Sequence, residues 1–404
     1  MEKVDVNVVG GGAAGCFAAI QAACEFPNSS IKILERGKQP LSKVKISGGG
    51  RCNVTNVLSE PSELSKNYPR GERFLKKAFY TFSSKDMVSW LENKKVPLKL
   101  YEDGCFFPQS NDSQTIIDLF LHELKRNKVD LLCNSRVDSI RKENENWIIK
   151  TDDNIYSAKS VIITTGGQPK ISGFDLLGEI DLKIVPPVPS LFTFNMPDEE
   201  IKVLMGIVKE KALVKIVGEK WSGDGPLLIT HWGMSGPAVL KTSAFGARDL
   251  SEKIYESSVS INWTGQLDFD EVSQHINELK KSNKLVSNLP LYEIKQRLWD
   301  FLLLRAEIPV HFRGSDLTNK HSNKLKETLV NDIYQMKGKT TFKEEFVTAG
   351  GIDLSEIDVK TMQAKRFPGL YFAGEVLDID GITGGFNFQA AWTTGFIAGS
   401  HCLD

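Results

Sequence analysis

The chain contains little cysteine and no cysteine-rich motif. Its six cysteines among 404 residues form no CxxC pair and no closely spaced set, which excludes a disulfide framework and the common zinc-binding motifs. No apolar run approaches the roughly 20 residues that a membrane-spanning helix needs, and the first expected strand begins where a secretion signal would place its basic and apolar regions. We therefore expect a soluble, cytoplasmic protein with reduced thiols and without a metal site.

The chain also has no excess of charge of one sign. Its 50 Lys and Arg residues are balanced by 51 Asp and Glu residues, so no overall attraction draws the protein to nucleic acid or to membranes. We expect a small-molecule substrate and neither nucleic acid nor a membrane as a partner, and we leave the oligomeric state open. The length and the 41% hydrophobic content predict two to three globular domains.

A strand, a glycine turn and a helix open the chain. The apolar residues of Val4–Val9 lead directly into the sequence GGGAAG, and an alanine-rich helix follows. In this pattern Gly10 permits the tight turn, Gly12 lets a pyrophosphate approach the backbone, and Gly15 lets helix and strand pack closely. The next expected strand ends at Glu35, 20 residues after Gly15, where a carboxylate can accept hydrogen bonds from ribose hydroxyls. The pattern predicts a dinucleotide site and leaves FAD and NAD open.

The C-terminal part of the chain favours FAD. Gly369–Glu375 is typical of a strand that ends in a carboxylate, Gly384–Gln389 opens a helix of small residues, and a third glycine turn, Thr165–Gly167, ends another expected strand. An extended FAD needs one site for its adenosine and pyrophosphate and a second site for its ribitol and flavin. The second helix start suits the flavin because its N–H groups stabilise negative charge on the reduced ring.

The middle of the chain has a different pattern. From about residue 191 to 267, short apolar runs with period-two alternation are broken by Gly and Pro, as in a small β-rich domain. From 268 to 336 the apolar residues recur at helical spacing, and Asp316 is a candidate N-cap for the last of these helices. No second GxGxxG motif occurs in this part, so a nicotinamide donor would dock transiently against the flavin.

Seven motifs are distributed over nearly the whole chain. They are GGGAAG at 10–15, the pair Glu35-Arg36, KISGGGRCNVTN at 45–56, DGCFFPQS at 103–110, ITHWGMSGPAVL at 229–240, TAGGI at 348–352 and GLYFAGEVLDIDGITGGFNFQAAWTTGFIAG at 369–399. Together they resemble the BaiN-like (YhiN-type) bacterial FAD-dependent oxidoreductases. The resemblance implies noncovalent FAD and an α/β fold of the two-dinucleotide-binding-domain flavoprotein type, in which a Rossmann-like FAD domain is interrupted by inserted β-rich and helical domains.

The motifs and the resemblance together give domain boundaries and candidate cofactor-binding residues. We expect the FAD-binding domain at residues 1–190 and 346–404, the β-rich domain at 191–267 and 337–345, and the helical domain at 268–336. The residues expected at the adenosine and pyrophosphate half of FAD are Gly10, Gly12, Ala13, Ala14, Gly15, Glu35, Arg36 and, through its backbone, Val137. The residues expected along the phosphates, ribitol and flavin are Ser47, Gly48, Gly49, Arg51, Cys52, Asn53, Thr165, Gly166, Gly167, Gly374, Glu375, Asp380, Gly384, Gly385, Asn387 and Phe388.

The resemblance also implies a place for the second glycine loop, KISGGGRCNVTN, between pyrophosphate and flavin. Its glycines would permit close approach, and Arg51 and Asn53 would donate hydrogen bonds to the cofactor. Cys52 is either a redox partner of the flavin or a small packed residue, and the packed role is favoured because no resolving cysteine accompanies it. The loop after Gly167 is shorter than is common in the family, which leaves the closure of the flavin's substrate side open.

His231 is the candidate catalytic acid or base, because imidazole can move a proton near neutral pH, and a structural histidine is the alternative. We expect a flavin-dependent reductase that takes hydride from NADH or NADPH onto flavin N5. It would pass the hydride to an activated carbon–carbon double bond, as in an enone, or to a similar small-molecule acceptor. The alternatives are a flavin oxidase or dehydrogenase of a small amine or metabolite, an FAD-dependent RNA-modifying protein and a noncatalytic FAD-binding protein.

Overall fold

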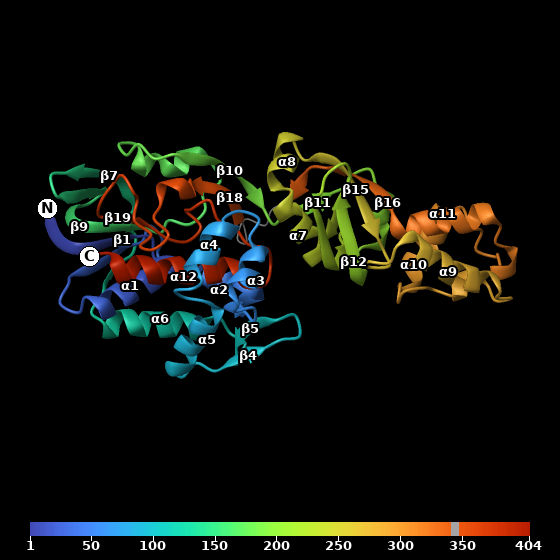
Figure 1. The fold of residues 1–404 in the computed structure, drawn as a ribbon, viewed down its shortest axis with the longest axis horizontal. Helices are drawn as coiled ribbons and strands as arrows, with labels where there is room; N and C mark the ends of the chain where they lie inside the picture. The colour runs from blue at the N-terminus through green and yellow to red at the C-terminus, as the bar shows by residue number, and fades with distance from the viewer. Residues whose placement is uncertain (341–346) are drawn as a thin grey trace. The chain divides into compact units, whose positions relative to one another are not determined.

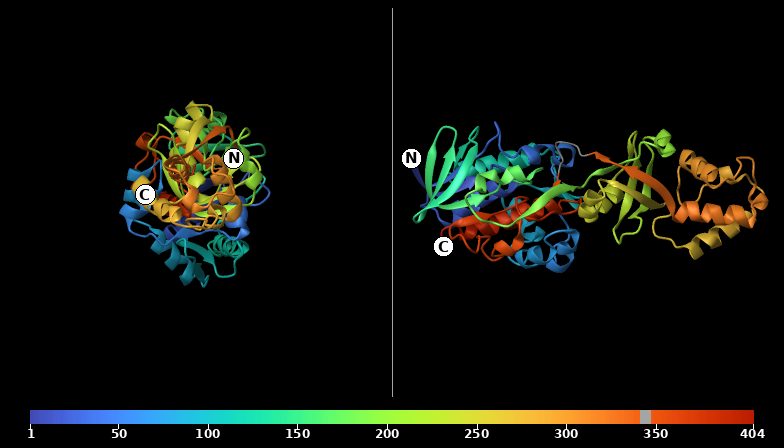
Figure 2. Two further views of the ribbon diagram at one scale, coloured as in Figure 1. Left: turned by 90° about the vertical axis from the view of Figure 1, so that its right-hand side faces the viewer. Right: turned by 90° about the horizontal axis from the view of Figure 1, so that it is seen from above.

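The computed structural model describes residues 1–340 and 347–404. The chain divides into two compact units, of which the first contains Met1–Pro189 and the C-terminal segment and the second begins at Ser190. Both chain termini lie at the same end of the first unit (Figures 1 and 2). The predicted boundary at 345/346 lies outside the described residues, and the division into three domains stays a prediction.

A seven-stranded sheet forms the centre of the first unit. Its strand order is β6-β2-β1-β9-β8-β7, and β19 pairs with the end of β9. The strands are β1 (Glu2–Val9), β2 (Ile31–Leu34), β6 (Asp130–Leu132), β7 (Val137–Glu143), β8 (Asn146–Thr151), β9 (Ile155–Ile163) and β19 (Leu370–Phe372). The pairs of β1 with β2 and β9, of β2 with β6 and of β9 with β19 are parallel, whereas β7, β8 and β9 form an antiparallel ribbon. The predicted α/β class with a Rossmann-like domain is therefore confirmed.

Two helices from opposite ends of the chain pack against each other in this unit, α1 (Ala13–Glu25) and α12 (Phe386–His401). They lie side by side in Figure 1, in blue and red. A Cβ atom on Gly395 would lie 2.7 Å from the Ala14 carbonyl oxygen, and one on Gly399 would lie 2.3 Å from the Ala18 carbonyl oxygen. The two backbones can approach so closely only because both positions are glycine. Since each step of four residues on one helix matches four on the other, the helices run parallel.

The rest of the first unit consists of short elements around this core. They are α2 (Ser42–Gly50), α3 (Pro61–Leu64), α4 (Glu72–Ala78), α5 (Ser84–Asn93), α6 (Gln114–Arg126), the sheet of β3 (Thr55–Asn56), β5 (Cys105–Pro108) and β4 (Leu98–Leu100), and the pair β10 (Ile184–Ser190) and β18 (Val347–Ile352). The helix α2 is interrupted by non-helical backbone at Ser47, Gly48 and Gly49. The second glycine loop is thus a turn inside a helical segment.

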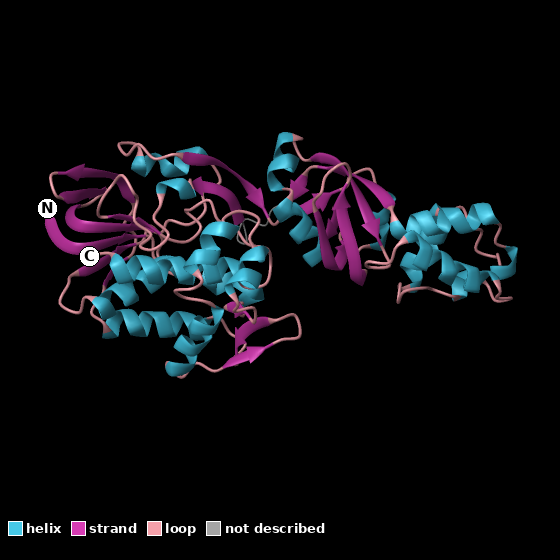
Figure 3. Cartoon of the chain, viewed as in Figure 1, coloured by secondary structure: helices cyan, strands magenta, loops and turns pink. Residues whose placement is uncertain are grey.

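The second unit combines an antiparallel sheet with helices. The sheet order is β16-β15-β12-β13-β14-β11-β17, with β11 (Thr193–Asn195), β12 (Val208–Ile216), β13 (Ser222–Ile229), β14 (Gly233–Ser235), β15 (Glu256–Asn262), β16 (Asp332–Lys337) and β17 (Lys339–Thr340). The helices are α7 (Pro237–Phe245), α8 (Ala247–Glu252), α9 (Phe269–Lys280), α10 (Gln296–Arg305) and α11 (Asn319–Val330). Figure 3 shows α9, α10 and α11 gathered at one end of the sheet.

One local prediction for the helical part is wrong. The N-cap of α11 is Thr318, whose hydroxyl accepts a hydrogen bond from the His321 N–H at 3.2 Å. Asp316 instead accepts from the Arg313 N–H at 2.7 Å and holds the preceding turn. Either residue type can cap a helix, so the aspartate near the expected helix start did not by itself fix the position of the cap.

The α1–α12 contact gives a test in which the usual effect of a helix substitution changes sign. In an open helix, Gly→Ala raises stability by up to about 1 kcal/mol. We expect Gly399→Ala to lower it by about 1–3 kcal/mol instead, because the added Cβ overlaps the Ala18 carbonyl. The measurement is the urea midpoint of unfolding, followed by tryptophan fluorescence, since Trp392 lies on α12. Ser400→Ala, one position further, is the control and should shift stability by about 0.5 kcal/mol or less; a Gly399→Ala protein as stable as this control would refute the contact.

Candidate functional site

The first glycine turn joins β1 to α1. A Cβ on Gly10, whose φ is +108°, would lie 2.5 Å from the Thr164 carbonyl oxygen, and a Cβ on Gly15 would lie 2.0 Å from the Gly10 carbonyl oxygen. These two glycines are therefore required by packing within the protein. A Cβ on Gly12, in contrast, would meet nothing within 4 Å, and no side chain caps the α1 start at this residue. The turn presents open space at Gly12 and a helix start without a side-chain cap, which is the arrangement that binds a phosphate.

Glu35 follows β2 and organises the neighbouring loops. Its carboxylate accepts hydrogen bonds from the Gly11 N–H and the Gly37 N–H, both at 2.6 Å, and its carbonyl oxygen accepts from the Ser135 N–H at 2.8 Å. Each carboxylate oxygen keeps a further lone pair for a ribose hydroxyl. Val137 begins β7 two residues after Ser135, so the predicted adenine contact lies next to the predicted ribose contact. Arg36 is exposed.

The second glycine loop has a left-handed backbone at three successive glycines. The φ angles of Gly48, Gly49 and Gly50 are +57°, +69° and +84°, and a Cβ on Gly49 or Gly50 would meet nothing within 4 Å. Ser47, which precedes them, is partly exposed. The Nε of Arg51 donates to the Gly48 carbonyl oxygen at 3.1 Å, and its guanidinium lies 4.5 Å from the centre of the Phe107 ring. The loop is therefore shaped by glycine and leaves an open strip along its backbone.

Residues at the C-terminal end of this loop are hydrogen-bonded to α12 and to the turn before it. The Asn53 amide, oriented to satisfy both of its partners, accepts from the Gly385 N–H and donates to the Thr55 carbonyl oxygen, both at 3.1 Å. Asn56 donates to the Gly384 carbonyl oxygen at 3.0 Å, and Trp392 donates to the Val54 carbonyl oxygen at 3.0 Å. The second glycine loop and the C-terminal glycine turn thus form one continuous structure.

The third glycine turn meets the carboxylate that follows β19. A Cβ on Gly166 would meet nothing within 4 Å, whereas one on Gly167 would lie 2.4 Å from a Glu375 carboxylate oxygen. Glu375 also accepts from the Thr348 N–H and from the Lys43 ammonium, both at 2.9 Å. Thr165, at the start of this turn, is partly exposed. Lys43 was not predicted as a site residue, because no sequence pattern links it to a carboxylate 332 positions away.

Three predicted cofactor residues have their side chains engaged within the protein. The Asn387 amide pairs with the Gly381 peptide group, accepting from its N–H at 2.8 Å and donating to its carbonyl oxygen at 2.9 Å. The buried Asp380 carboxylate forms an ion pair with Arg70. The Phe388 ring stacks on Trp392 with ring centres 5.6 Å apart. The Asp380 and Asn387 side chains hold the loop before α12 in shape, and Phe388 packs within the helix itself. Contact of these residues with a cofactor would therefore be made through the backbone.

The two remaining glycine positions complete the C-terminal turn. Gly374 donates its N–H to the Thr394 hydroxyl at 2.9 Å, and a Cβ there would lie 2.8 Å from the Ala14 side chain. Gly385, with φ +86°, is the N-cap of α12, and no side chain caps this helix start. Gly374 therefore joins the C-terminal strand to α1, and Gly385 opens a second helix start whose first N–H groups are left for a ligand.

The two helix starts are offset along a common direction. From the contacts of Gly395 with Ala14 and of Gly399 with Ala18, α12 begins about eight residues, or roughly 12 Å, before α1. This offset suits an extended cofactor with its phosphates at α1 and its ring at α12. The open space at Gly12, Gly49, Gly50 and Gly166 gives room for such a molecule, so the residues present fit FAD.

Cys52 is buried, with a left-handed backbone at φ +61°. Burial raises the pKa of its thiol from 9.0 to about 12, so the thiol stays protonated near neutral pH. A nucleophilic cysteine needs a lowered pKa and an accessible sulfur. This geometry favours the packed role over the redox role.

His231 belongs to the second unit, in the turn between β13 and β14. Its ring is exposed and lies 4.3 Å from the Trp232 ring, centre to centre, in an edge-to-face arrangement. The imidazole is therefore open to solvent. Its role as acid or base stays a prediction.

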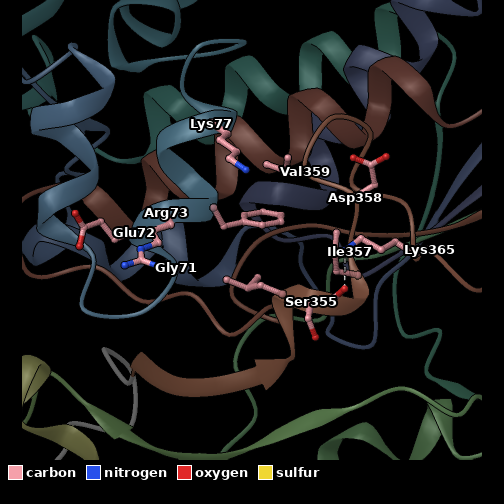
Figure 4. A pocket seen from close by; sticks show the side chains of 11 residues that line it. Gly71, Glu72, Arg73, Lys77, Ser355, Ile357, Asp358, Val359 and Lys365 are labelled. Atoms are coloured by element: carbon pink, nitrogen blue, oxygen red, sulfur yellow. Dashed lines mark hydrogen bonds between the residues drawn. The ribbon is translucent and has the colours of Figure 1, made fainter.

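A groove of about 680 Å³ lies elsewhere in the first unit, between α4 and the segment around 354–365. Figure 4 shows Arg73 and Lys77 on α4 and Lys365 on the facing segment, and Phe74 and Ile357 also line it. None of the predicted cofactor residues lines this groove, so it is separate from the glycine-lined site. Among the described residues, no group of three or more His, Cys, Asp or Glu side chains could hold a metal ion, and no helix there is long and apolar enough to cross a membrane.

The fold and the glycine-lined site define an FAD-dependent oxidoreductase with a Rossmann-like FAD domain. The chain belongs to the family described as HI0933-like protein Rossmann domain, which matches residues 4–401. The resemblance to the BaiN-like, YhiN-type proteins that the motifs predicted is thereby confirmed.

Two named relatives match over almost the whole chain. It is 29% identical to the ribosomal RNA dihydrouridine synthase of Escherichia coli (strain K12), over 98% of this chain and 96% of the relative. It is 26% identical to the 3-dehydro-bile acid delta(4,6)-reductase of Clostridium scindens, over 98% of both chains. Among solved structures, the 3-ketosteroid-delta4-(5alpha)-dehydrogenase of Rhodococcus jostii RHA1 has the same fold, with a TM-score of 0.54 at 12% identity over 100% of this chain and 97% of that chain.

The open space at Gly12 predicts a selective loss of FAD. The φ of this residue is −84°, which any residue can adopt, and aspartate is a good N-cap. We expect Gly12→Asp to keep the fold and to weaken FAD binding about 100-fold or more, because its carboxylate would lie against the pyrophosphate. Gly12→Asn, which has the same shape without the charge, is the matched control. Titration of the FAD-free proteins followed by flavin fluorescence gives both affinities, and equal affinities would argue against a phosphate at this turn.

The raised pKa of Cys52 predicts low reactivity and a pH effect on stability. Near pH 8, iodoacetamide should alkylate the exposed Cys24 and leave Cys52 unmodified in the folded protein, as mass spectrometry of peptides would show. Because the folded-state pKa of about 12 exceeds the ordinary value of 9.0, folding favours the neutral thiol. Its contribution to stability is present below pH 9 and is lost as the pH rises towards 12. Equal labelling of both cysteines would contradict the buried thiol.

Proposed function

We propose that the protein is a cytoplasmic flavin-dependent reductase that acts on a carbon–carbon double bond conjugated to a carbonyl group in a small-molecule acceptor. NADH or NADPH is the donor. In the overall reaction the double bond gains one hydride and one proton, and the donor becomes NAD⁺ or NADP⁺. Bound FAD supplies a ring that exchanges hydride at N5.

One observation carries this proposal, namely the pair of uncapped helix starts of α1 and α12 with three glycine turns along them. The α1 start would hold the pyrophosphate. The α12 start would stabilise the negative charge of the reduced ring, since the positive end of the helix dipole points there. The chain has no second GxGxxG motif, which supports a donor that docks transiently and leaves before the acceptor enters.

The relatives support the choice of acceptor. One relative is named as a bile acid reductase, and reduction of a conjugated alkene is the chemistry that this name describes. Such a reduction needs a proton at the carbon next to the carbonyl group in addition to the hydride. His231 is the candidate donor of this proton, because its imidazole is exposed to solvent and can be reloaded between turnovers.

The second candidate is the reduction of uridine in ribosomal RNA. It is favoured by two relatives named ribosomal RNA dihydrouridine synthase, at 29% and 28% identity, each covering at least 96% of both chains. The bond saturated in dihydrouridine is conjugated to a ring carbonyl group, so it belongs to the same chemical class as an enone. The balanced overall charge predicts no general attraction to RNA. The names of these two relatives nevertheless support RNA as a candidate acceptor.

The test follows the flavin spectrum without oxygen. We expect the oxidised-flavin absorbance of the purified protein to bleach when NADH or NADPH is added. We then expect it to return on addition of either a conjugated steroid enone or a short uridine-containing RNA, with a mass gain of about 2 Da in the acceptor that is reduced. Return of the colour only with oxygen would instead identify an oxidase, and a flavin that no donor reduces would identify a binding protein.

The same assay tests His231. We expect His231→Ala to leave the bleaching by NADH or NADPH unchanged and to slow acceptor reduction about 10²-fold, the usual contribution of a positioned acid. His311→Ala, which alters another histidine of the second unit, is the matched control. An unchanged rate of acceptor reduction in His231→Ala would remove this residue from the chemistry.

A further inference from the structure

A cluster of cationic and aromatic side chains lies beside the second glycine loop. The Arg51 guanidinium lies 4.5 Å from the centre of the Phe107 ring and 5.8 Å from that of the Tyr101 ring, and the Lys99 ammonium lies 5.0 Å from the Tyr101 centre. The two rings meet edge to face with their centres 5.1 Å apart. Lys99 is exposed and Tyr101 and Arg51 are partly exposed, whereas Phe107 is buried. Arg51 and Lys99 both lie over the partly exposed Tyr101 ring. Packing of the protein does not require two cations on one ring, so these cations are available to a ligand.

Hydrogen bonds fix this cluster to the glycine loop. The Ser113 N–H donates to the Gly50 carbonyl oxygen at 2.9 Å, and the Ser113 hydroxyl donates to the Lys45 carbonyl oxygen at 2.7 Å. The Tyr101 hydroxyl donates to the Asn111 side chain at 3.3 Å. The loop that carries Asn111 and Ser113 therefore joins the aromatic cluster to the backbone expected along FAD.

The sequence around the cluster is positively charged. Residues 38–113 contain 13 Lys and Arg residues and 8 Asp and Glu residues, a net charge of +5, whereas the whole chain has a net charge of −1. The rest of the chain must then carry −6. Lys43, Arg70 and Lys94 of this segment form ion pairs with Glu375, Asp380 and Glu123, which lie outside it. The +5 less these three carboxylates leaves a net charge of about +2, which still favours a polyanion where the whole protein does not. Lys43, Lys45 and Lys99 are exposed in this segment.

The geometry points to a docking site for single-stranded RNA at Arg51, Tyr101 and Lys99, a proposal that rests on the second candidate function above. An unpaired base stacks on the guanidinium plane of Arg51 and the ring of Tyr101, as bases stack on aromatic and arginine planes in RNA-binding proteins. Lys99 meets the adjoining phosphate. The buried Phe107 ring packs on the Arg51 guanidinium and fixes its orientation. The RNA strand would then follow the second glycine loop towards the flavin.

The experiment measures the binding of a fluorescent single-stranded oligouridine to the FAD-loaded protein by fluorescence anisotropy. We expect Tyr101→Ala to weaken binding about tenfold or more and Tyr101→Phe to keep most of it, because stacking needs the ring and not the hydroxyl. Lys99→Glu should weaken binding and reduce its salt dependence between about 50 and 200 mM, since one phosphate contact is lost.

Two matched controls separate this site from general effects of charge and surface. Tyr80→Ala removes an exposed tyrosine of the same unit, and Lys76→Glu reverses an exposed lysine of α4. FAD content and melting temperature show whether each variant is folded. Losses in Tyr101→Ala and Lys99→Glu no greater than in these controls would overturn the proposal. Competition of NADPH with the oligouridine, lost in Tyr101→Ala, would also overturn the proposal, because the cluster would then bind the nicotinamide donor and not RNA.

The outcome is distinguishable from a failure of the proposed function. If oligouridine binds through Tyr101 while neither NADH nor NADPH bleaches the flavin, the docking site stands and the reductase fails. If the donor bleaches the flavin and a steroid enone restores it while oligouridine does not bind, the reductase stands and the docking site fails.

Discussion

The close contact of α1 with α12 is the constraint on which the cofactor site depends. The two helices come from opposite ends of the chain, and Gly395 and Gly399 let their backbones meet where any side chain would overlap a carbonyl oxygen. Helix packing of this kind fixes position along the axis as well as distance, because Gly395 faces the Ala14 carbonyl and Gly399 faces the Ala18 carbonyl at the same time. It thereby sets the offset between the two helix starts, and this offset decides what length of ligand can reach both.

The second glycine loop is held against the C-terminal turn and α12 by hydrogen bonds. Its glycines leave the backbone bare, and the residues that follow bind the C-terminal turn through Asn53, Asn56 and the Val54 carbonyl. The loop cannot shift without breaking bonds to α12. Such a cofactor site is preformed, because contacts within the protein hold its three glycine turns. The space along these turns is open at glycines, which have no side chain to fill it.

The sequence indicated where the glycine turns lie, whereas it did not indicate the partners of the polar side chains near them. Gly10, Gly12 and Gly15 follow from local geometry, since a turn between a strand and a helix has few solutions. Asp380 and Asn387 were predicted as cofactor contacts, but their side chains pair with Arg70 and with the Gly381 peptide. The Asp380–Arg70 pair, like that of Lys43 with Glu375, joins positions more than 300 residues apart, and no periodic pattern in the sequence indicates it. The prediction of Asp316 as a helix cap was wrong because the helix has its N-cap two residues later, at Thr318, a residue type that satisfies the same local rule.

Overall charge proved to be a coarse guide to partners. A net charge of −1 over 404 residues hides a segment of +5 beside the glycine loop, and a ligand responds to charges within roughly a Debye length of about 10 Å, not to the sum over the chain. The relatives named for bile acids and for ribosomal RNA act on molecules that share a double bond conjugated to a carbonyl group and little else. If one cofactor cradle serves both, the selection between them must come from surfaces outside it. We propose that Lys99 and Tyr101 form such a surface, because they adjoin Arg51 at the edge of the second loop, where the expected cofactor site ends.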